Sequence, residues 1–246
     1  MRLDGFLAQA SGLSRKEARR AINRGLVSVN GKKVRSASHT VTTDDRVDFQ
    51  DHNAGDVSGL TLALPNERYL MLNKPAGMVT ATTDSSQPVV LDLLPPELKP
   101  GLHPVGRLDK DTTGLLLLTT DGQWSHRITS PRRACPKTYR VSLAEPLAAD
   151  ARQQLETGVL LNGEARETRP ARVELIDDKT IDLTITEGRY HQVKRMLAAV
   201  GNHVAGLDRR RIGNISLDPG LAPGQYRELT PEETAAFSPS AQNDQP

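Results

Sequence analysis

Short strand-like segments, spread along most of the chain, constrain its fold more than any other feature of the sequence. Two of them alternate apolar and polar residues, as strands with one buried face do, and two are compact apolar runs bounded by turn residues. The four segments are Tyr69–Leu72, Leu115–Leu118, Thr138–Leu143 and Thr180–Ile185. Tyr190–Val200 has helical spacing instead and is followed by Gly201, a residue typical of helix C-termini. Strands that neighbour one another along the chain, with occasional helices, predict an α+β fold on a mixed, mainly antiparallel sheet.

Length and composition are those of an ordinary globular protein. The 246 residues, 37% hydrophobic and 25% charged, are enough for one large or two modest domains. No apolar run approaches the roughly 18 residues of a membrane span, and the first residues lack the apolar core of a signal peptide. Cys135 is the single cysteine, which fits a reducing compartment. We therefore expect a cytoplasmic protein without membrane contact, and a monomer as the default.

The net charge of +2 is distributed unevenly along the chain. Residues 11–35 contain eight basic residues and a single acidic one, Glu17, which gives this segment a net charge of +7 and leaves −5 for the rest. Such an asymmetry favours a basic module joined to a near-neutral body, and it is typical of nucleic-acid-binding proteins. A solvated charged surface is the alternative that charge alone leaves open.

The basic segment belongs to two predicted helices at the N-terminus. Apolar residues at helical spacing predict a first helix over residues 3–10. Ser14 and Glu17 form a capping-box pattern, which predicts a second helix that runs to about Arg24 and ends at Gly25. The small and apolar residues of the second helix face inward, so its arginines and lysines project from the other side.

A small sheet is predicted to follow the two helices. Asn30–Gly31 stands between Val27–Val29 and the basic pair Lys32–Lys33, and Asn-Gly between alternating residues is a strong hairpin signal. Val41 and Val47–Phe49, around a turn at residues 43–45, would complete this sheet.

Two helices that display Arg and Lys, followed by a Val-Asn-Gly-Lys hairpin, resemble the S4 RNA-binding domain over Met1–Phe49. The resemblance implies a surface that binds the phosphates of folded RNA by shape and charge. The candidate RNA-binding residues in this module are Arg15, Lys16, Arg19, Arg20, Arg24, Lys32 and Lys33.

Polar stretches divide the remaining sequence. Residues 51–66 contain glycines and a proline without sustained periodicity, and the last ten residues are mostly polar. We therefore predict a first domain over residues 1–50, a linker over 51–66, a larger domain over 67–236 and a disordered tail over 237–246.

The segment Gly106–Gly114 holds the densest group of chemically capable side chains. Its two glycines enclose two carboxylates, Asp109 and Asp111, together with two cations and two hydroxyls, directly before a predicted strand. Loops at strand ends often carry catalytic groups. From the residues alone, a polar turn is equally favoured, and either carboxylate could serve.

Sequence patterns of several other catalytic classes are missing. The six histidines show no zinc-type spacing, and Cys135 has no cysteine partner. Phosphate-binding loops of the Walker type, dinucleotide fingerprints and Gly-x-Ser-x-Gly elbows do not occur either. We therefore expect chemistry that uses ordinary side chains, with no metal and no cofactor.

The sequence Gly-Arg-Leu-Asp at residues 106–109, continued by Asp-Thr-Thr-Gly and a leucine run, resembles the signature loop of RNA pseudouridine synthases. Three further segments resemble motifs of that family, in the same order along the chain. They are Leu72–Gly77, Lys137–Tyr139 and Glu187–Met196. With the S4-like module, the resemblance covers the chain to about Glu233 and implies a pseudouridine synthase domain.

The resemblance also implies a reaction and a set of roles. In this family a uridine loses its N1–C1′ bond, the base turns, and C5 joins C1′, so substrate and product are isomers. Asp109 would be the catalytic carboxylate, which either attacks C1′ or removes the C2′ proton. Tyr139 would stack on the extruded uracil, and Lys194, rather than Arg195, would hold the charge and geometry of the aspartate. Arg107 would contact the RNA around the flipped nucleotide.

Other readings of these residues remain open from pattern alone. Tyr139 on an alternating strand is more often a core residue, and Lys194 on a helix is more often a surface lysine. We interpret Lys74 as a residue that positions the loop and Asp111 as structural, because the family motif assigns the catalytic carboxylate to Asp109.

Details of the motifs narrow the resemblance to one branch of the family. Gly before Arg-Leu-Asp is typical of the branch that modifies one defined rRNA uridine. Tyr190–Arg195 and Gln123–Arg132 are most similar to the branch that acts on 16S rRNA of the small subunit, which implies uridine 516 as target. The expected partner is 16S rRNA or a small-subunit assembly intermediate. The alternatives are a large-subunit rRNA pseudouridine synthase and a non-catalytic S4-type assembly factor.

Overall fold

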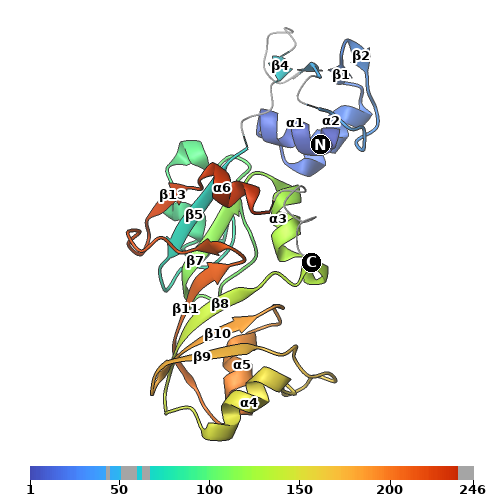
Figure 1. Cartoon of the computed structure of the whole chain (residues 1–246). Coiled ribbons are helices and arrows are strands. Elements are labelled where there is room, and N and C mark those ends of the chain that lie inside the picture. The colour runs from blue at the N-terminus through green and yellow to red at the C-terminus, as the bar shows by residue number, and fades with distance from the viewer. Residues whose placement is uncertain (43–44, 51–59, 63–66, 238–246) are drawn as a thin grey trace. The chain divides into compact units, whose positions relative to one another are not determined.

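The structure is a computed structural model that describes residues 1–42, 45–50, 60–62 and 67–237 (Figure 1). The chain divides into two compact units. The first unit comprises residues 1–67 and 96–101, and the second comprises residues 68–95 and 102–246. None of the helices in the described ranges has the length and apolarity needed to cross a membrane.

The first unit begins with the two predicted helices, α1 (Leu3–Ser11) and α2 (Arg15–Asn23). Ser14 and Glu17 form the predicted capping box at the start of α2, and Gly25 ends that helix with a left-handed φ of 74°. The apolar faces of both helices pack into one core, in which Phe6 and Ile22 are almost fully buried. The arginines and lysines of α2 are left on the exposed side.

The sheet of the first unit has the order β2 (Lys32–Lys33), β1 (Val27–Val29), β3 (Val47–Phe49) and β4 (Leu60–Leu62). Asn30 and Gly31 both have positive φ, and Val29 pairs with Lys32, which confirms the two-residue hairpin. Val41 is buried in this core but belongs to no strand. Of the turn predicted at 43–45, residues 43 and 44 lie outside the described residues.

Within the predicted linker over residues 51–66, the structure has one short strand, β4, whose three residues pair antiparallel with β3. Three residues are too few to show a periodic pattern, and only the neighbouring strand provides their hydrogen bonds. Residues 51–59 and 63–66 lie outside the described residues.

The second unit is built on a nine-stranded sheet, which confirms the predicted α+β fold. All pairings in this sheet are antiparallel except that of β7 with β11. The main order is β13 (Tyr226–Glu228), β5 (Tyr69–Lys74), β7 (Thr113–Thr119), β11 (Val204–Ile212), β8 (Lys137–Leu143), β10 (Thr180–Ile185) and β9 (Arg172–Asp177). The short strands β6 (His103–Pro104) and β12 (Ile215–Ser216) pair with β7 and β11.

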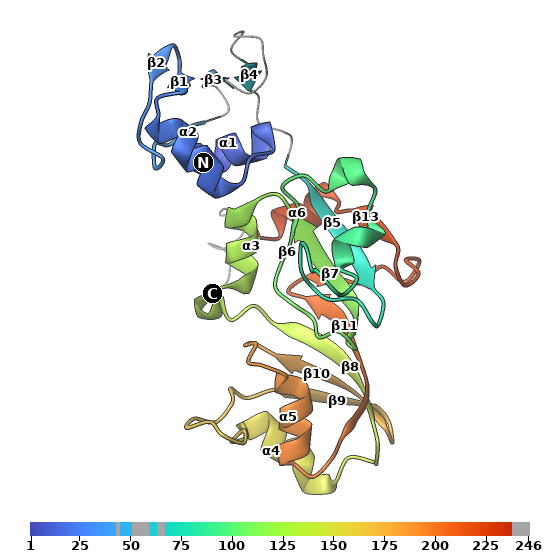
Figure 2. The ribbon, with the colours of Figure 1, turned by 180° about the vertical axis from the view of Figure 1, so that it is seen from behind.

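Helices lie beside both halves of this sheet. The helices are α3 (Gly122–Thr129), α4 (Ala149–Thr157), α5 (Gln192–Ala199) and α6 (Pro231–Ala235), with single 3-10 turns at Val90–Leu93 and Pro131–Arg133 in the second unit and at Pro96–Leu98 in the first. The strands β8, β10 and β9 stand in front of α4 and α5 in Figure 1, and the opposite view in Figure 2 brings these helices to the front. Both helices therefore cover the same face of that half of the sheet.

The chain end packs differently from the prediction. Phe237, assigned to a disordered tail, is only 8% exposed and contacts Trp124 edge-on, with ring centroids 5.8 Å apart. The backbone oxygen of Phe237 accepts a hydrogen bond from Arg127 at 2.6 Å. A lone aromatic residue beside a polar tail gives no periodic signal, so only the core around Trp124 reveals its place. Residues 238–246 lie outside the described residues.

The helix predicted over residues 190–200 is shorter than expected. It begins at Gln192, because His191 has a left-handed φ of 48° that no α-helix contains. Tyr190 and His191 therefore belong to the loop between β10 and α5. At the other end, Gly201 has the predicted positive φ of 79°, and its N–H donates to Ala198.

Candidate active site

Lys74, the last residue of β5, binds the backbone of the loop before β7, residues 106–112. Its side chain is fully buried, and Nζ donates to four carbonyl oxygens. The acceptors are those of Pro75 at 3.1 Å, Asp109 at 3.1 Å, Lys110 at 3.2 Å and Thr112 at 2.8 Å. The burial lowers the pKa of Lys74 to about 8, against the opposing charges of Asp111 and Asp109. Lys74 therefore has the loop-positioning role that the sequence suggested.

Two further contacts determine the course of this loop. Thr80 Oγ1 donates to the carbonyl of Leu108 at 2.7 Å and accepts from its N–H at 3.2 Å. Gly114 has a φ of 95°, and a Cβ there would lie 2.7 Å from the backbone nitrogen of Arg209 on the parallel strand β11. Glycine is required at this position, because any side chain would push β7 and β11 apart.

The loop brings both carboxylates of the motif to one lysine. Lys194 Nζ lies 3.5 Å from Asp109 Oδ2, and it donates to the Asp111 oxygens at 2.7 and 2.8 Å. Burial disfavours the charged form of Lys194, but the hydrogen bond to Asp111 and the charges of both carboxylates outweigh it and raise its pKa. The same hydrogen bond lowers the pKa of Asp111. Asp111 thus belongs to the charge arrangement of the site, beyond the structural role expected for it.

Arg195, the alternative to Lys194, points to a different cluster. Its Nη1 lies 2.6 Å from Glu164 Oε1, and Nη2 donates to the carbonyl of Asn162 at 2.8 Å. Glu164 also accepts from Arg189 Nη1 at 2.6 Å. Consecutive residues on a helix project in different directions. Lys194 therefore reaches Asp109, while Arg195 binds Glu164 and the carbonyl of Asn162.

His191 is a neighbour of Asp109 that the sequence did not single out. Its Nε2 lies 3.6 Å from Asp109 Oδ1, whereas Lys194 approaches the other carboxylate oxygen, Oδ2. The ring stacks on Tyr190, with centroids 3.8 Å apart and planes inclined by 21°. Tyr190 is 73% exposed. The left-handed backbone of His191 places its ring here, and nothing in helical periodicity could have indicated it.

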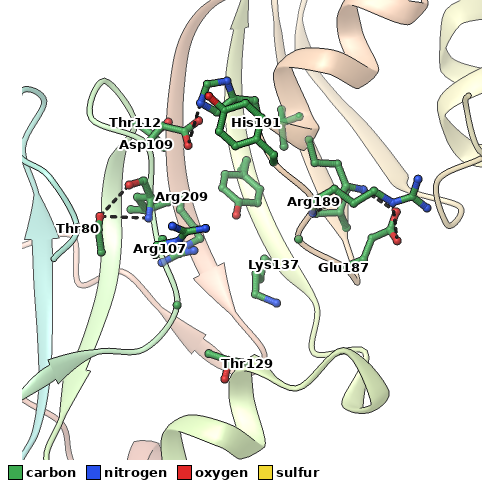
Figure 3. Close-up of a pocket in the computed structure, with 18 of the residues that line it drawn as sticks. Thr80, Arg107, Asp109, Thr112, Thr129, Lys137, Glu187, Arg189, His191 and Arg209 are labelled. Atoms are coloured by element: carbon green, nitrogen blue, oxygen red, sulfur yellow. Dashed lines mark hydrogen bonds and ion pairs between the residues drawn. The ribbon is translucent and has the colours of Figure 1, made fainter. Parts of the chain in front are cut away.

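These residues border a pocket of about 540 Å³, a volume typical of small-ligand sites. Figure 3 shows Asp109 and His191 at the top of this pocket and Lys137 and Thr129 toward its lower end. Tyr139 on β8 lines the pocket and is 9% exposed, so it is at once a core residue and a pocket residue. Arg107 lines the pocket from its exposed rim.

The structure thus brings Asp109, Tyr139, Lys194 and Arg107 to one pocket. The seven basic residues predicted to bind RNA lie on the first unit, and all are exposed. Of these seven, Arg19 also donates to the buried carboxylate of Asp4 at 2.9 Å. In addition to His191, the pocket includes Lys137 and Arg209. Sequence reasoning gave neither a role, because Lys137 entered only as the first residue of a family motif and nothing in the run Asp208–Arg211 indicates which arginine faces the pocket.

The arrangement holds a carboxylate at a pocket large enough for a small ligand. A lysine and a histidine flank the carboxylate, and an aromatic ring that can pack against a flat base lies in the same pocket. Among the described residues, no three His, Cys, Asp or Glu side chains lie together in a way that could hold a metal ion.

Comparison with known proteins identifies both units. Residues 68–199 match the family described as RNA pseudouridylate synthase, and residues 1–47 match the S4 domain. The chain is 50% identical over 236 residues to ribosomal small subunit pseudouridine synthase A of Escherichia coli (strain K12), covering 96% of this chain and 99% of that protein. It is 47% identical over 233 residues to the Haemophilus influenzae protein of the same name, covering 95% and 97%.

A solved structure supports the same assignment. A crystal structure of a pseudouridylate synthase superposes with a TM-score of 0.70 at 45% identity, covering 97% of this chain and all of that one. The family match includes Asp109, Tyr139 and Lys194, and the relatives and the solved structure cover nearly the whole chain. The chain therefore belongs to the RNA pseudouridylate synthase family and is a pseudouridine synthase with an N-terminal S4 domain.

Proposed function

We propose that this enzyme converts one uridine of 16S rRNA to pseudouridine, at the uridine 516 site, with Asp109 as the catalytic carboxylate. The observation that carries the proposal is the placement of Asp109 in the pocket, with Lys194 Nζ at 3.5 Å and with Tyr139 lining the same pocket. The relatives named small subunit pseudouridine synthases cover nearly the whole chain, which favours a small-subunit RNA as substrate.

The reaction needs a uridine that has left the RNA stack, since its C1′ must reach Asp109. Asp109, with Lys194 beside it, attacks C1′ or takes the C2′ proton while the N1–C1′ bond breaks. Tyr139 packs against the released uracil and assists loss of the C5 proton after C5 has bonded to C1′. N1 gains a proton, so that product and substrate are isomers.

The first unit supplies the RNA affinity in this proposal. Its exposed cations Arg15, Lys16 and Arg20 on α2, with Arg24, Lys32 and Lys33 nearby in the sequence, would neutralise phosphates of the folded RNA. Arg19, shared with Asp4, would contribute less. Arg107 at the pocket rim would contact the RNA next to the flipped nucleotide.

We propose 16S rRNA, or an assembling small subunit, as the partner of a monomeric enzyme in the cytoplasm. The test compares wild-type enzyme with Asp109→Asn and with Asp178→Asn, a control carboxylate exposed between β9 and β10. Naked 16S rRNA and assembly particles are treated with each enzyme, and carbodiimide adducts are mapped by primer extension.

Wild type and Asp178→Asn should give one stop in 16S rRNA, whereas Asp109→Asn should bind the RNA and give none. A stop found only in large-subunit rRNA would contradict the proposed target. A normal stop with Asp109→Asn would contradict the catalytic assignment. A protein that binds rRNA but modifies none would be an assembly factor instead.

A further inference from the structure

Among the described residues that line the pocket, Arg209 on β11 is the only buried cation, with 2% of its surface exposed. It lies opposite Tyr139 in the antiparallel register of β11 and β8. Its guanidinium carbon is 6.0 Å from the centroid of the Tyr139 ring. Nε donates to the carbonyl of Leu115 at 2.8 Å, which fixes the side chain against β7.

The rest of this guanidinium lacks the carboxylate partners that two other pocket cations, Arg189 and Lys194, have. Arg209 Nη2 is a buried atom with no hydrogen-bond partner, and no carboxylate forms an ion pair with Arg209 within the described ranges. By contrast, Arg189 bonds Glu164 and Glu187, and Lys194 bonds Asp111. Burying an unpaired charge is costly, so the position of Arg209 points to a partner that arrives with the substrate.

The surroundings of Arg209 are positive. Lys137 on the adjacent strand lines the same pocket, and its amine donates to the carbonyl of Cys135 at 3.0 Å. Burial lowers the pKa of Lys137, and the charge of Arg209 lowers it further. The acidic groups of the pocket, Asp109 and Glu187, are paired with other cations. This part of the pocket therefore favours an anion.

The proposed reaction produces an anion at this place. When the N1–C1′ bond breaks, its electron pair stays with the uracil, and the charge spreads from N1 over the two carbonyl oxygens. The base that packs against Tyr139 then lies beside Arg209. A preorganised donor in a site that excludes water stabilises such a developing charge far more than it would in water.

We propose that Arg209 is a catalytic residue that donates a hydrogen bond to a carbonyl oxygen of the uracil and stabilises the base anion between its release and its reattachment. The pair on N1 later accepts a proton, the C5–C1′ bond takes its electrons from the ring, and C5 loses its proton. This inference rests on the proposed function, because it assigns a group that handles the same uridine.

The test combines variants of Arg209 with altered bases. RNA carrying a labelled uridine, 2-thiouridine or 4-thiouridine at the target is incubated with excess enzyme, and product is followed by nuclease digestion and chromatography. The enzymes are wild type, Arg209→Gln, Arg209→Lys and the matched control Arg211→Gln, whose exposed side chain lies on the same strand outside the pocket.

Arg209→Gln should slow the single-turnover rate by about 10² to 10³-fold, the loss typical of one preorganised donor, with RNA affinity unchanged. Arg209→Lys keeps the charge and should lose less, and Arg211→Gln should match wild type. Sulfur is a weaker acceptor than oxygen. If Arg209 bonds one of the two carbonyl oxygens, replacing that oxygen by sulfur should affect wild type and the Arg209 variants differently. For that substrate, the ratio of the uridine rate to the thiouridine rate should differ by about fivefold or more between wild type and the variants, as for groups in contact.

The proposal would be overturned if the ratio of the uridine rate to the thiouridine rate agreed within about twofold between wild type and the Arg209 variants, for both 2-thiouridine and 4-thiouridine. This holds whatever the absolute rates are. If Arg209→Gln loses its circular-dichroism signal and is therefore unfolded, the comparison of wild type with Arg209→Lys on the uridine and thiouridine substrates decides alone. Wild type that is inactive on small-subunit RNA but active on large-subunit RNA would contradict the proposed target only. The same comparison on that RNA would still decide whether Arg209 contacts the base.

Discussion

The first unit and the pocket of the second unit use positive charge in opposite ways. On the first unit, exposed cations such as Lys16, Arg20 and Arg24 make no ion pair within the described residues. Around the pocket, Lys74 is held by four carbonyls, and Lys194 by two carboxylates. Free surface charges attract RNA over a distance and tolerate displacement, whereas fixed charges determine where a reacting atom lies.

This difference separates affinity from catalysis. Substitutions of the fixed cations should change rates at constant RNA affinity, and substitutions of the exposed cations should change affinity and its salt dependence at constant rate.

The largest effect is expected for Lys194→Met, which removes the cation shared by Asp109 and Asp111. The single-turnover rate should fall by about 10²-fold or more, because the carboxylate loses its partner and its geometry. Filter binding should give the wild-type RNA affinity. Lys179→Met, at an exposed lysine on the β9–β10 turn, is the matched control. If Lys194→Met lost RNA affinity and kept the wild-type rate, Lys194 would contribute to binding and not to catalysis.

Lys74→Met should reduce both rate and stability. The variant leaves three carbonyls of the active-site loop and that of Pro75 without their donor, at a cost of roughly 2 kcal/mol in the free energy of unfolding. A loop that is less well held should also lower the rate by about tenfold. Urea unfolding and single-turnover assays measure the two quantities, and an unchanged rate would show that the loop needs no such support.

The pH dependence of stability gives a second test of Lys74. Its pKa is about 8 in the folded chain against 10.5 for an ordinary lysine, so the unfolded chain binds more protons between these values. The free energy of unfolding should therefore gain a contribution as pH rises from about 8 to 10.5, and the cost of the buried charge is fully present below that window. Lys74→Met should lack this rise in urea titrations at several pH values.

A smaller effect is expected for Glu164→Gln. Glu164 bonds Arg189 and Arg195, which flank the Tyr190–His191 turn, at 2.6 Å each. Without these two ion pairs the turn that places His191 beside Asp109 is held less well, so the rate should fall by about fivefold while RNA affinity stays constant. Glu174→Gln, an exposed glutamate on β9, is the control. Equal rates in both variants would mean that the turn is held by its backbone alone.

The smallest effect per residue is expected for Arg20→Gln and Arg24→Gln on the first unit. Each should weaken RNA binding by about threefold and reduce the slope of log affinity against log salt by about 1. The rate at saturating enzyme should be unchanged. Arg172→Gln, an exposed arginine on the second unit, should change neither quantity. A salt slope that stays constant would exclude phosphate contacts at α2.

Local patterns accounted for much of the fold. The Ser14–Glu17 box, the Asn30–Gly31 hairpin and the alternation of β8 and β10 need only neighbouring residues, and the structure has all of them. Two features without a local pattern were missed, β4 on β3 and Phe237 on Trp124. The three residues of β4 are too few to show a period, and the single Phe237 shows none.

The sequence by itself determined the class of the protein, because Gly106–Gly114 and the segments that resemble family motifs mark it as a pseudouridine synthase and indicate Asp109 over Asp111. Only the tertiary structure decided what surrounds that carboxylate. The left-handed backbone at His191, the sharing of Lys194 with Asp111 and the unpaired guanidinium of Arg209 all arise where separate strands and loops meet. The burial of a side chain and its pairing depend on residues from several distant segments, so a local sequence pattern cannot predict them.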